Sequence, residues 1–364
     1  MIRRFHPLLL ALIPLVVASC SKDADNSTLG PGFDDRGVAL GAANLFAPQR
    51  ALVWSAATNE LVGVAGSAAG VGSEALIAMS ASSGAIRLLD AAPTGSLRLS
   101  EDGGFVYYES FVSDTGVAGD RVELRRRPLG AGASQLVATC SGVCAHLFAI
   151  SDDESRVAWS RLDSEFDPES LRIVSQPSGA LESPGAGLPV AFAPDASALL
   201  YQTSSVASAL QQWLASSGAG SPFDLGLPLG AAVASLDWSD QGVQVLYLQG
   251  AHELWLRNAT AATTRRVLLA PGDSLLSAPI AWSRDGRKAA LWALEQLEQQ
   301  QQTVARLYVV DLVGTNSRVV ASGLTSQGAV AFSPDGSRIA QLFGGQLYTS
   351  ELGASVRSQV ARSR

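Results

Sequence analysis

The sequence predicts an all-β fold, a seven-bladed β-propeller built from four-stranded antiparallel blades. Two observations support this prediction. A large apolar residue followed by a recognisable version of the pattern Ser-x-Asp-Gly recurs seven times, and neighbouring copies lie 42 to 51 residues apart by subtraction of their residue numbers. Each copy also contains four β-like runs. A period of about 40–50 residues with four strands per unit is typical of propeller blades, whereas a helical solenoid would show a 3.6-residue period.

The clearest copy of the repeated pattern is Phe332-Ser333-Pro334-Asp335-Gly336. The proline fixes φ at the first turn position, the aspartate bonds the backbone ahead of it, and the glycine accepts a conformation that a Cβ would resist. The pattern therefore predicts a hairpin turn. The residues at the place of Ser333, which we call the anchors, are Ser55, Ser100, Ser151, Ala193, Ser239, Ser283 and Ser333. Copies one, three and four depart from the pattern, with Asn59, Glu154 and Ala196 near the place of the glycine.

The strands that follow the turn define the rest of each blade. The third strand of the blades is predicted at 74–79, 121–126, 171–175, 211–214, 252–256, 306–311 and 346–352. The whole propeller is predicted to span residues 37–364, with blades at approximately 50–93, 94–140, 145–187, 188–230, 232–272, 276–323 and 327–362. Residues 294–302 read as an insertion in blade six, an extended hairpin tip with a helical tendency.

Two copies of the repeat carry a family resemblance. Trp282-Ser283-Arg284-Asp285-Gly286 and Phe332-Ser333-Pro334-Asp335-Gly336 resemble the WD-like repeats of TolB-type propellers, and the resemblance covers roughly residues 50–361. It implies a periplasmic or surface propeller that binds other proteins, and it carries over no catalytic residue.

The chain begins with features of a lipoprotein signal peptide over residues 1–19. Arg3 and Arg4 precede an apolar run at 8–17 that is too short to span a bilayer. The segment Val17-Ala18-Ser19-Cys20 resembles the bacterial lipobox, which predicts that Cys20 is lipidated; the alternative is an ordinary secretory signal. Acyl chains contribute about 0.8 kcal/mol per buried methylene, so they would hold the protein on a membrane. We expect a location in the bacterial cell envelope, at the outer membrane and facing the periplasm or the cell surface.

The segment after the signal peptide is predicted to connect the lipid to the propeller. Residues 20–36 are small and polar without a period, which is typical of a flexible tether. Residues 38–46 are more apolar. They are expected either to add an outer strand that closes the ring or to cover the edge of blade one.

Charge excludes one class of function. The whole chain has a net charge of −7, and removal of the signal peptide takes away two arginines and no acids, which leaves −9. Lys22 and Lys288 are the only lysines, and the Arg125-Arg126-Arg127 run is more typical of a solvated strand face. Nucleic-acid binding needs clustered cations, so we do not expect a nucleic-acid partner.

Two further cysteines remain after lipidation of Cys20. Cys140 and Cys144 are predicted to form a local disulfide in an oxidising compartment, at the crossover from blade two to blade three. The alternative is a metal site with His146, which would lack a convincing fourth ligand.

Motifs of known catalysts are absent from the sequence. There is no Gly-x-Ser-x-Gly elbow and no His-Glu-x-x-His motif. We therefore predict that the chain is not an enzyme and has no cofactor, and that it acts as a scaffold or protein-binding module. The alternative is an enzyme or a carbohydrate-binding or ligand-binding propeller, with a site at the mouth of the central channel built from residues distant in sequence.

Two long insertions predict where a partner would bind. Residues 109–120 and 160–170 join strands two and three of blades two and three, on the face that also carries the crossovers between blades. Loops on a rigid scaffold concentrate binding residues. The partner-binding residues are predicted to be Phe111, Asp114, Asp163, Glu165, Phe166 and Asp167, with the aromatic rings as anchors and the carboxylates steering a basic patch of an envelope protein. We expect the protein itself to be a monomer.

The same acidic loop has a second interpretation. Asp163, Glu165, Asp167 and Glu169 occupy alternate positions, so an extended chain would place four carboxylates on one side, where they could hold calcium. Pro168 stands where an EF-type calcium loop needs glycine, so a solvated loop without metal is the preferred interpretation.

Overall fold

The computed structural model describes the strands of the chain and most of the turns between them. The described residues are 38–40, 52–65, 74–91, 93–112, 121–141, 144–162, 168–176, 178–203, 210–239, 241–250, 253–267, 273–275, 281–297, 302–314, 316–324, 328–343 and 346–352. No helix is found among them, and therefore none that is long and apolar enough to cross a membrane. The predicted signal peptide, with Cys20, and the tether lie outside the described residues.

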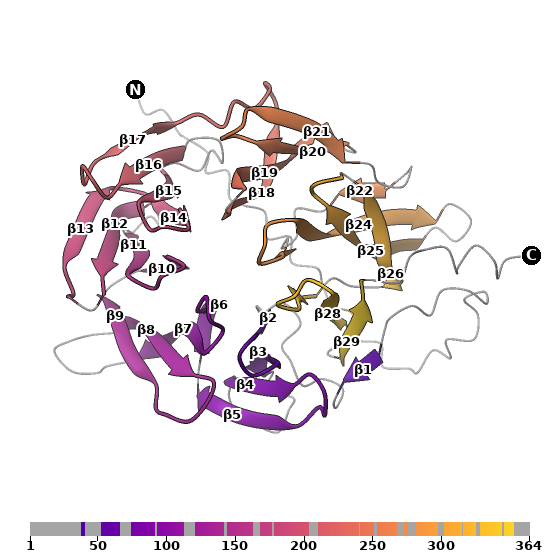
Figure 1. The fold of residues 1–364 in the computed structure, drawn as a ribbon, viewed down its shortest axis with the longest axis horizontal. Coiled ribbons are helices and arrows are strands. Elements are labelled where there is room, and N and C mark those ends of the chain that lie inside the picture. Colours follow the sequence, from indigo (N-terminus) through magenta and orange to yellow (C-terminus); the bar gives the residue numbers. More distant parts are fainter. Residues whose placement is uncertain are drawn as a thin grey trace, which may run out of the picture. The chain divides into compact units, whose positions relative to one another are not determined.

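The chain folds into seven antiparallel sheets, as predicted (Figure 1). Blade one contains β2 (Leu52–Trp54), β3 (Glu60–Ala65), β4 (Ala75–Ser80) and β5 (Ile86–Ala91). Blade two contains β6 (Pro93–Leu99), β7 (Phe105–Val112), β8 (Arg121–Pro128) and β9 (Gln135–Ser141). Blade three contains β10 (Cys144–Ile150), β11 (Arg156–Leu162), β12 (Pro168–Ser175) and β13 (Leu181–Gly185). Blade four contains β14 (Leu188–Phe192), β15 (Ala198–Gln202), β16 (Leu210–Leu214) and β17 (Gly220–Phe223).

The last three blades follow the same plan with two variations. Blade five contains β18 (Ala232–Ser239), β19 (Gly242–Gln249), β20 (Glu253–Asn258) and β21 (Thr263–Val267). Blade six contains β22 (Asp273–Leu275), β23 (Ala281–Trp282), β24 (Lys288–Leu297), β25 (Gln302–Asp311) and β26 (Ser317–Leu324), and both β22 and β23 pair with β24. Blade seven contains β27 (Val330–Phe332), β28 (Arg338–Phe343), β29 (Gln346–Glu351) and β1 (Val38–Leu40).

Seven hydrophobic clusters join the blades into a closed ring. Each cluster combines buried side chains of two neighbouring blades, because side chains alternate between the two faces of a strand and both faces of a blade are covered. Between blades one and two, for example, Val62 and Leu76 share a cluster with Leu97 and Val106. The ring closes where Trp54 of blade one packs in a cluster with residues of blade seven.

The N-terminal strand completes the seventh blade. β1 pairs antiparallel with β29, in a register that sets Ala39 opposite Tyr348. Of the two roles considered for residues 38–46, the described part therefore supplies an outer strand. The predicted range 327–362 for blade seven lacks this strand, because the strand comes from the opposite end of the sequence.

The repeated turns share one hydrogen-bonding pattern. In blade two, the Oγ of Ser100 donates to the Oδ1 of Asp102 at 2.7 Å and accepts from the backbone N–H of Phe105 at 2.9 Å. The anchors Ser151, Ser283 and Ser333 repeat both bonds. The copies that lack glycine keep the turn's positive φ, which is 50° at Asn59, 57° at Glu154 and 58° at Ala196.

Two local predictions need correction. Residues 109–112 belong to β7 rather than to a loop, because the strand continues its pairing with β8 as far as Val112. The tip of blade six shows no helical tendency in its described part, since β24 and β25 pair continuously from Lys288 to Leu297. Cross-strand pairing outweighs the helical propensity of the glutamine-rich segment there.

Candidate functional site at the corner of blades two and three

Strand β7 presents one of its faces to blade three. Tyr107 lies in the cluster that also holds Phe148 and Trp159 of blade three, so alternation places Glu109 and Phe111 on the same face. Glu109 pairs with Leu124 and Phe111 with Val122 in the register of β7 and β8. The Glu109 carboxyl group and the Phe111 ring are therefore successive side chains on this face. They lie toward the end of blade two from which the chain crosses to blade three.

Glu109 lies in a small hollow between the two blades. Its walls are Val122, Leu124 and Ala138 of blade two, Cys140 and Cys144, and Phe148 and Trp159 of blade three. The space open to the centre of a water molecule is about 10 Å³, which is room for about one water. Nearly all of these walls are apolar.

The apolar walls change the acidity of Glu109. Burial disfavours the charged carboxylate and raises the pKa of Glu109 to about 8. At neutral pH the side chain is therefore mainly a neutral carboxylic acid, able to donate a hydrogen bond. A strongly shifted pKa caused by desolvation in a recess is a known mark of functional sites.

Trp159 of blade three also lines this hollow. The indole N–H of Trp159 is buried and has no hydrogen-bond acceptor among the described residues. A buried donor without an acceptor costs about 1–3 kcal/mol. An acceptor for this N–H, such as a water molecule or a carbonyl oxygen, would remove that cost.

The wall between the blades contains a disulfide. Cys140 and Cys144 are bonded, with their Cα atoms 6.2 Å apart, which is the pairing that the sequence predicts. The bond connects the end of β9 to the start of β10, so it fixes the crossover beside Glu109. Both thiols are used, and the alternative of a metal site that includes them is therefore wrong.

Phe111 stands at the rim of the corner. Its side chain is 47% exposed, although its strand neighbours Tyr107 and Glu109 on the same face are buried. The other predicted partner-binding residues, Asp114, Asp163, Glu165, Phe166 and Asp167, lie outside the described residues. Residues 160–162 and 168–170 belong to β11 and β12, so the loop of blade three is shorter than predicted.

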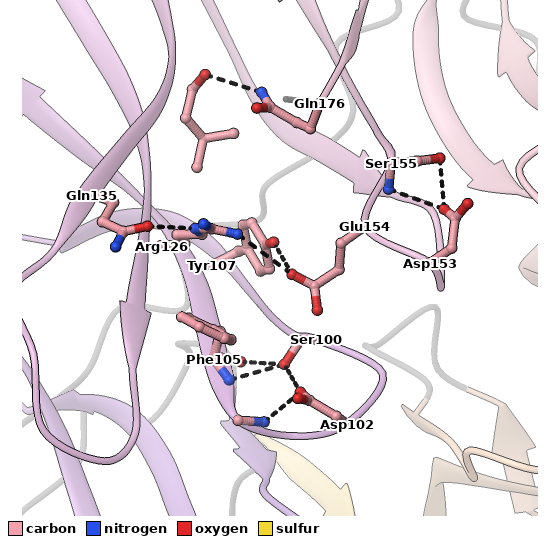
Figure 2. Close-up of polar contacts among 12 residues, drawn as sticks. Ser100, Asp102, Phe105, Tyr107, Arg126, Gln135, Asp153, Glu154, Ser155 and Gln176 are labelled. Carbon is pink, nitrogen blue, oxygen red and sulfur yellow. Dashed lines mark hydrogen bonds and ion pairs between the residues drawn. The ribbon is translucent and has the colours of Figure 1, made fainter. Parts of the chain in front are cut away.

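A polar network ties the opposite end of the same two blades together (Figure 2). The Tyr107 hydroxyl donates to Glu154, and Arg126 lies 3.9 Å from the Glu154 carboxylate. Arg126 also donates to Gln135 at 2.8 Å and stacks over the ring of Phe105. Burial and the bond to Glu154 raise the pKa of Tyr107. The network explains why copy three of the repeat has Glu154 where other copies have glycine.

The arginine run on β8 is not a free basic surface. Besides the contacts of Arg126, the Arg125 guanidinium binds the Glu123 carboxylate at 2.6 Å. Two of the three arginines predicted to form a solvated face are therefore engaged within blade two.

Glu109 is the residue that sequence reasoning missed. It was placed in a loop, although the alternation of Phe105, Tyr107, Glu109 and Phe111 in the sequence already puts it on the face of the two rings. For metals, the described residues contain no group of three or more His, Cys, Asp or Glu side chains that could hold an ion. The carboxylates considered for calcium at 163, 165 and 167 are not among them.

Comparison with known proteins relates the fold to solved structures only. No family model matches the chain. No curated protein matches it either. The oligogalacturonate lyase of Vibrio parahaemolyticus matches with a TM-score of 0.61 and 13% identity, over 88% of this chain and 92% of that chain. An oligogalacturonate lyase in complex with manganese matches with a TM-score of 0.60 and 14% identity, over 88% of this chain and 100% of that one.

TolB structures, whose repeats the sequence motif resembles, are also among the solved structures that match. TolB from Acinetobacter baumannii is among the matches, with 14% identity over 70% of this chain and 61% of that chain. Its TM-score is 0.49, so this likeness carries no argument about function. The prediction that the chain is not an enzyme is wrong, because lyases are among the structures most similar in fold. Missing motifs do not exclude catalysis in this architecture. The chain is a seven-bladed β-propeller.

Proposed function

We propose that this chain is a lipid-anchored propeller of the bacterial cell envelope that binds a partner protein at the corner of blades two and three. The observation that carries the proposal is Phe111, a large aromatic side chain that stays 47% exposed on the same face of β7 as the buried Tyr107 and Glu109. Exposed aromatic rings next to a recess are typical anchors of protein interfaces. The rigid β7–β8 ladder would hold the ring in place before binding.

Charge supports a basic partner segment. The chain without its signal peptide has a net charge of −9, and the segments that follow β7 and β11 in the sequence contain Asp114, Asp163, Glu165 and Asp167. Such carboxylates would speed the encounter with a basic protein surface, and salt would weaken that effect. The partner we propose is an envelope protein with a basic segment and one apolar side chain that packs on Phe111.

Site-specific crosslinking tests the docking surface. A photo-reactive residue at position 111, introduced in intact envelopes, should crosslink to a defined protein. The same residue at position 88 of blade one, where Leu88 is also exposed, should not. With the purified partner, Phe111→Ser should weaken binding about tenfold or more, and Leu88→Ser should leave it unchanged. Equal crosslinks from both positions, or equal affinities of both variants, would place the interface elsewhere.

The membrane anchor is tested separately. Cys20→Ala should block acylation and leave an unprocessed precursor or a soluble species, because the acyl chains supply the membrane affinity. Fractionation and mass measurement of the N-terminal peptide would show this. A Cys20→Ala protein that is still mature and needs detergent for extraction would contradict the lipid anchor.

A further inference from the structure

The connection between blades four and five presents a fully exposed leucine. Residues 224–231 join β17, the outermost strand of blade four, to β18, the first strand of blade five. Within this loop the side chain of Leu229 is 103% exposed. The other large apolar side chains exposed on the described part of the chain reach at most 62%. Leu229 is therefore uncovered by the rest of the protein, whereas the others are partly covered.

The loop is held firmly by blade five and by its own turn. Leu225 is buried in the cluster between blades four and five, and the Nε of Arg257 on β20 donates to its carbonyl oxygen at 2.5 Å. Gly226 has a φ of 61° and lies so close to the Arg257 guanidinium that a Cβ would overlap it. The backbone N–H of Ala231 donates to the carbonyl oxygen of Pro228 at 3.1 Å, which closes the turn at the tip. The exposure of the leucine at this tip is therefore built into the fold.

The tip is apolar and uncharged. No charged side chain lies between Asp224 and Asp237 in the sequence, and Pro228 and Ala232 are exposed beside Leu229. An apolar environment would cover this tip without desolvating a charge. A stable protein interface needs about 800 Å² from each partner and a polar rim, which a short uncharged tip does not offer. A lipid surface fits better, because lipid adapts to a protruding side chain and needs no complementary shape.

The lipid anchor of the proposed function brings such a surface within reach. Residues 21–37 separate Cys20 from β1, and a chain of this length spans at most about 60 Å. The longest strands have 10 residues, so the blades extend only about 30 Å in the strand direction. The tether therefore lets either end of the blades contact the bilayer. Because anchor and loop belong to one chain, the loop meets the membrane at a high effective concentration, and a weak contact suffices.

We propose that the 224–231 loop inserts Leu229 into the bilayer that holds the acyl chains of Cys20. The insertion depends on the lipid anchor of the proposed function. The loop lies at the end of the blades opposite the repeated turns, as does the Cys140–Cys144 crossover. Contact of the loop with the membrane would bring the corner with Phe111 close to the bilayer surface, where a membrane protein of the envelope presents its exposed segments.

Photo-crosslinking in vesicles tests the contact. The full lipidated protein, with a photo-reactive residue at position 229, is reconstituted into vesicles of phosphatidylcholine, a neutral lipid that does not repel the acidic chain. Mass spectrometry then measures the fraction of the labelled peptide that carries phosphatidylcholine. Position 88 on β5, where Leu88 is 62% exposed, is the control. Position 229 should give at least about fivefold more lipid adduct than position 88, because only the tip of the loop inserts.

A substitution shows whether the leucine itself drives the contact. With the photo-reactive residue moved to position 232, Leu229→Ser should lower the lipid adduct about fivefold or more, because a serine side chain gains little from the bilayer. Leu88→Ser should leave the adduct within about twofold. Circular dichroism would confirm that each variant folds.

Three outcomes would overturn the insertion. They are equal adducts at positions 229 and 88, an unchanged adduct in Leu229→Ser, and a crosslink from position 229 to a protein in intact envelopes without a lipid adduct in vesicles. The mass of the N-terminal peptide distinguishes these outcomes from failure of the anchor. A chain without acyl groups on Cys20 would contradict the proposed function as well, whereas an acylated chain with equal adducts contradicts only the insertion of the loop.

Discussion

Glu109 shows how burial alone gives one residue a special property. The neighbouring strand positions supply only apolar walls, so the carboxyl group keeps its proton well above its ordinary pKa of 4.5. The same strand leaves Phe111 exposed one step further along the face. Two neighbouring positions on one face of β7 thus hold a buried carboxyl group and an exposed aromatic side chain. The pKa of Glu109 shows how well the interface between blades two and three excludes water.

The burial of Glu109 predicts a pH dependence of stability. The folded state holds a proton that the unfolded chain has lost, so the free energy of unfolding should fall as pH rises from about 4.5 to about 8 and level off above. The loss should be of the order of a few kcal/mol. Urea denaturation across this range would measure it.

Matched variants assign this pH dependence to its source. Glu109→Gln should remove the contribution of Glu109 over the whole range from about pH 4.5 to about 8, and the exposed Glu101→Gln should keep the wild-type profile. A smaller fall between about pH 4 and 6 should remain in Glu109→Gln, because burial also raises the pKa of Asp237 to about 6. An unchanged profile in Glu109→Gln would contradict a neutral, buried carboxyl group at this position.

The repeated turn is the element on which the blades are built. Its serine–aspartate bond is present in copies two, three, six and seven, and in copy three it persists although Glu154 replaces the glycine. Copies with Glu154 or Ala196 accept an unfavourable positive φ. In copy three the carboxylate gains the Tyr107 hydroxyl in return, and the turn becomes a link between two blades.

Substitutions at two turn glycines can distinguish the cost of backbone strain from the cost of a steric clash with the neighbouring blade. A Cβ at Gly336 would meet no atom closer than the Nζ of Lys288 at 3.5 Å, so Gly336→Ala should cost about 1 kcal/mol through its φ of 64° alone. A Cβ at Gly103 would lie 2.8 Å from the backbone nitrogen of Ala56 in blade one. Gly103→Ala should therefore cost about 1–3 kcal/mol more. Equal losses in urea denaturation would show that the neighbouring turn yields.

At the scale of the whole molecule, stability depends on closure of the ring. Every blade packs its two faces on two neighbours, and no blade has a large apolar core of its own. The last blade is completed by β1, so the two ends of the folded region are held in one sheet. This pairing also covers the edge of β29, which would otherwise be free to pair with another chain.

Truncation tests the role of β1. A chain without residues 20–40 should lose about 2–4 kcal/mol relative to full length, because three ladder positions disappear, and it should associate through β29. A chain without residues 20–36 keeps β1 and serves as the control. Thermal melting and light scattering would distinguish the two. If both truncated chains melt and scatter alike, β1 does not contribute to closure.

The sequence alone determined the repeat and therefore the architecture. The signals for it are local: a large apolar residue before each anchor, turn residues such as Asp335 and Gly336, and four β-like runs per repeat. Local signals can be read from one sequence because they do not depend on which segments pack together in space. The Cys140–Cys144 disulfide could also be predicted from the sequence, because these are the two cysteines left after Cys20 and they lie only four positions apart.

Only the tertiary structure shows which residues from different blades lie close together. The pKa of Glu109 depends on walls that come from two blades, and the pKa of Asp237 depends on Arg98, which lies more than a hundred residues away in the sequence. The outer strand of blade seven comes from the N-terminal side of the whole repeat array. Burial and electrostatic interaction depend on distance in space. A single sequence carries that information only where contacts are local or periodic, and at these three places they are neither.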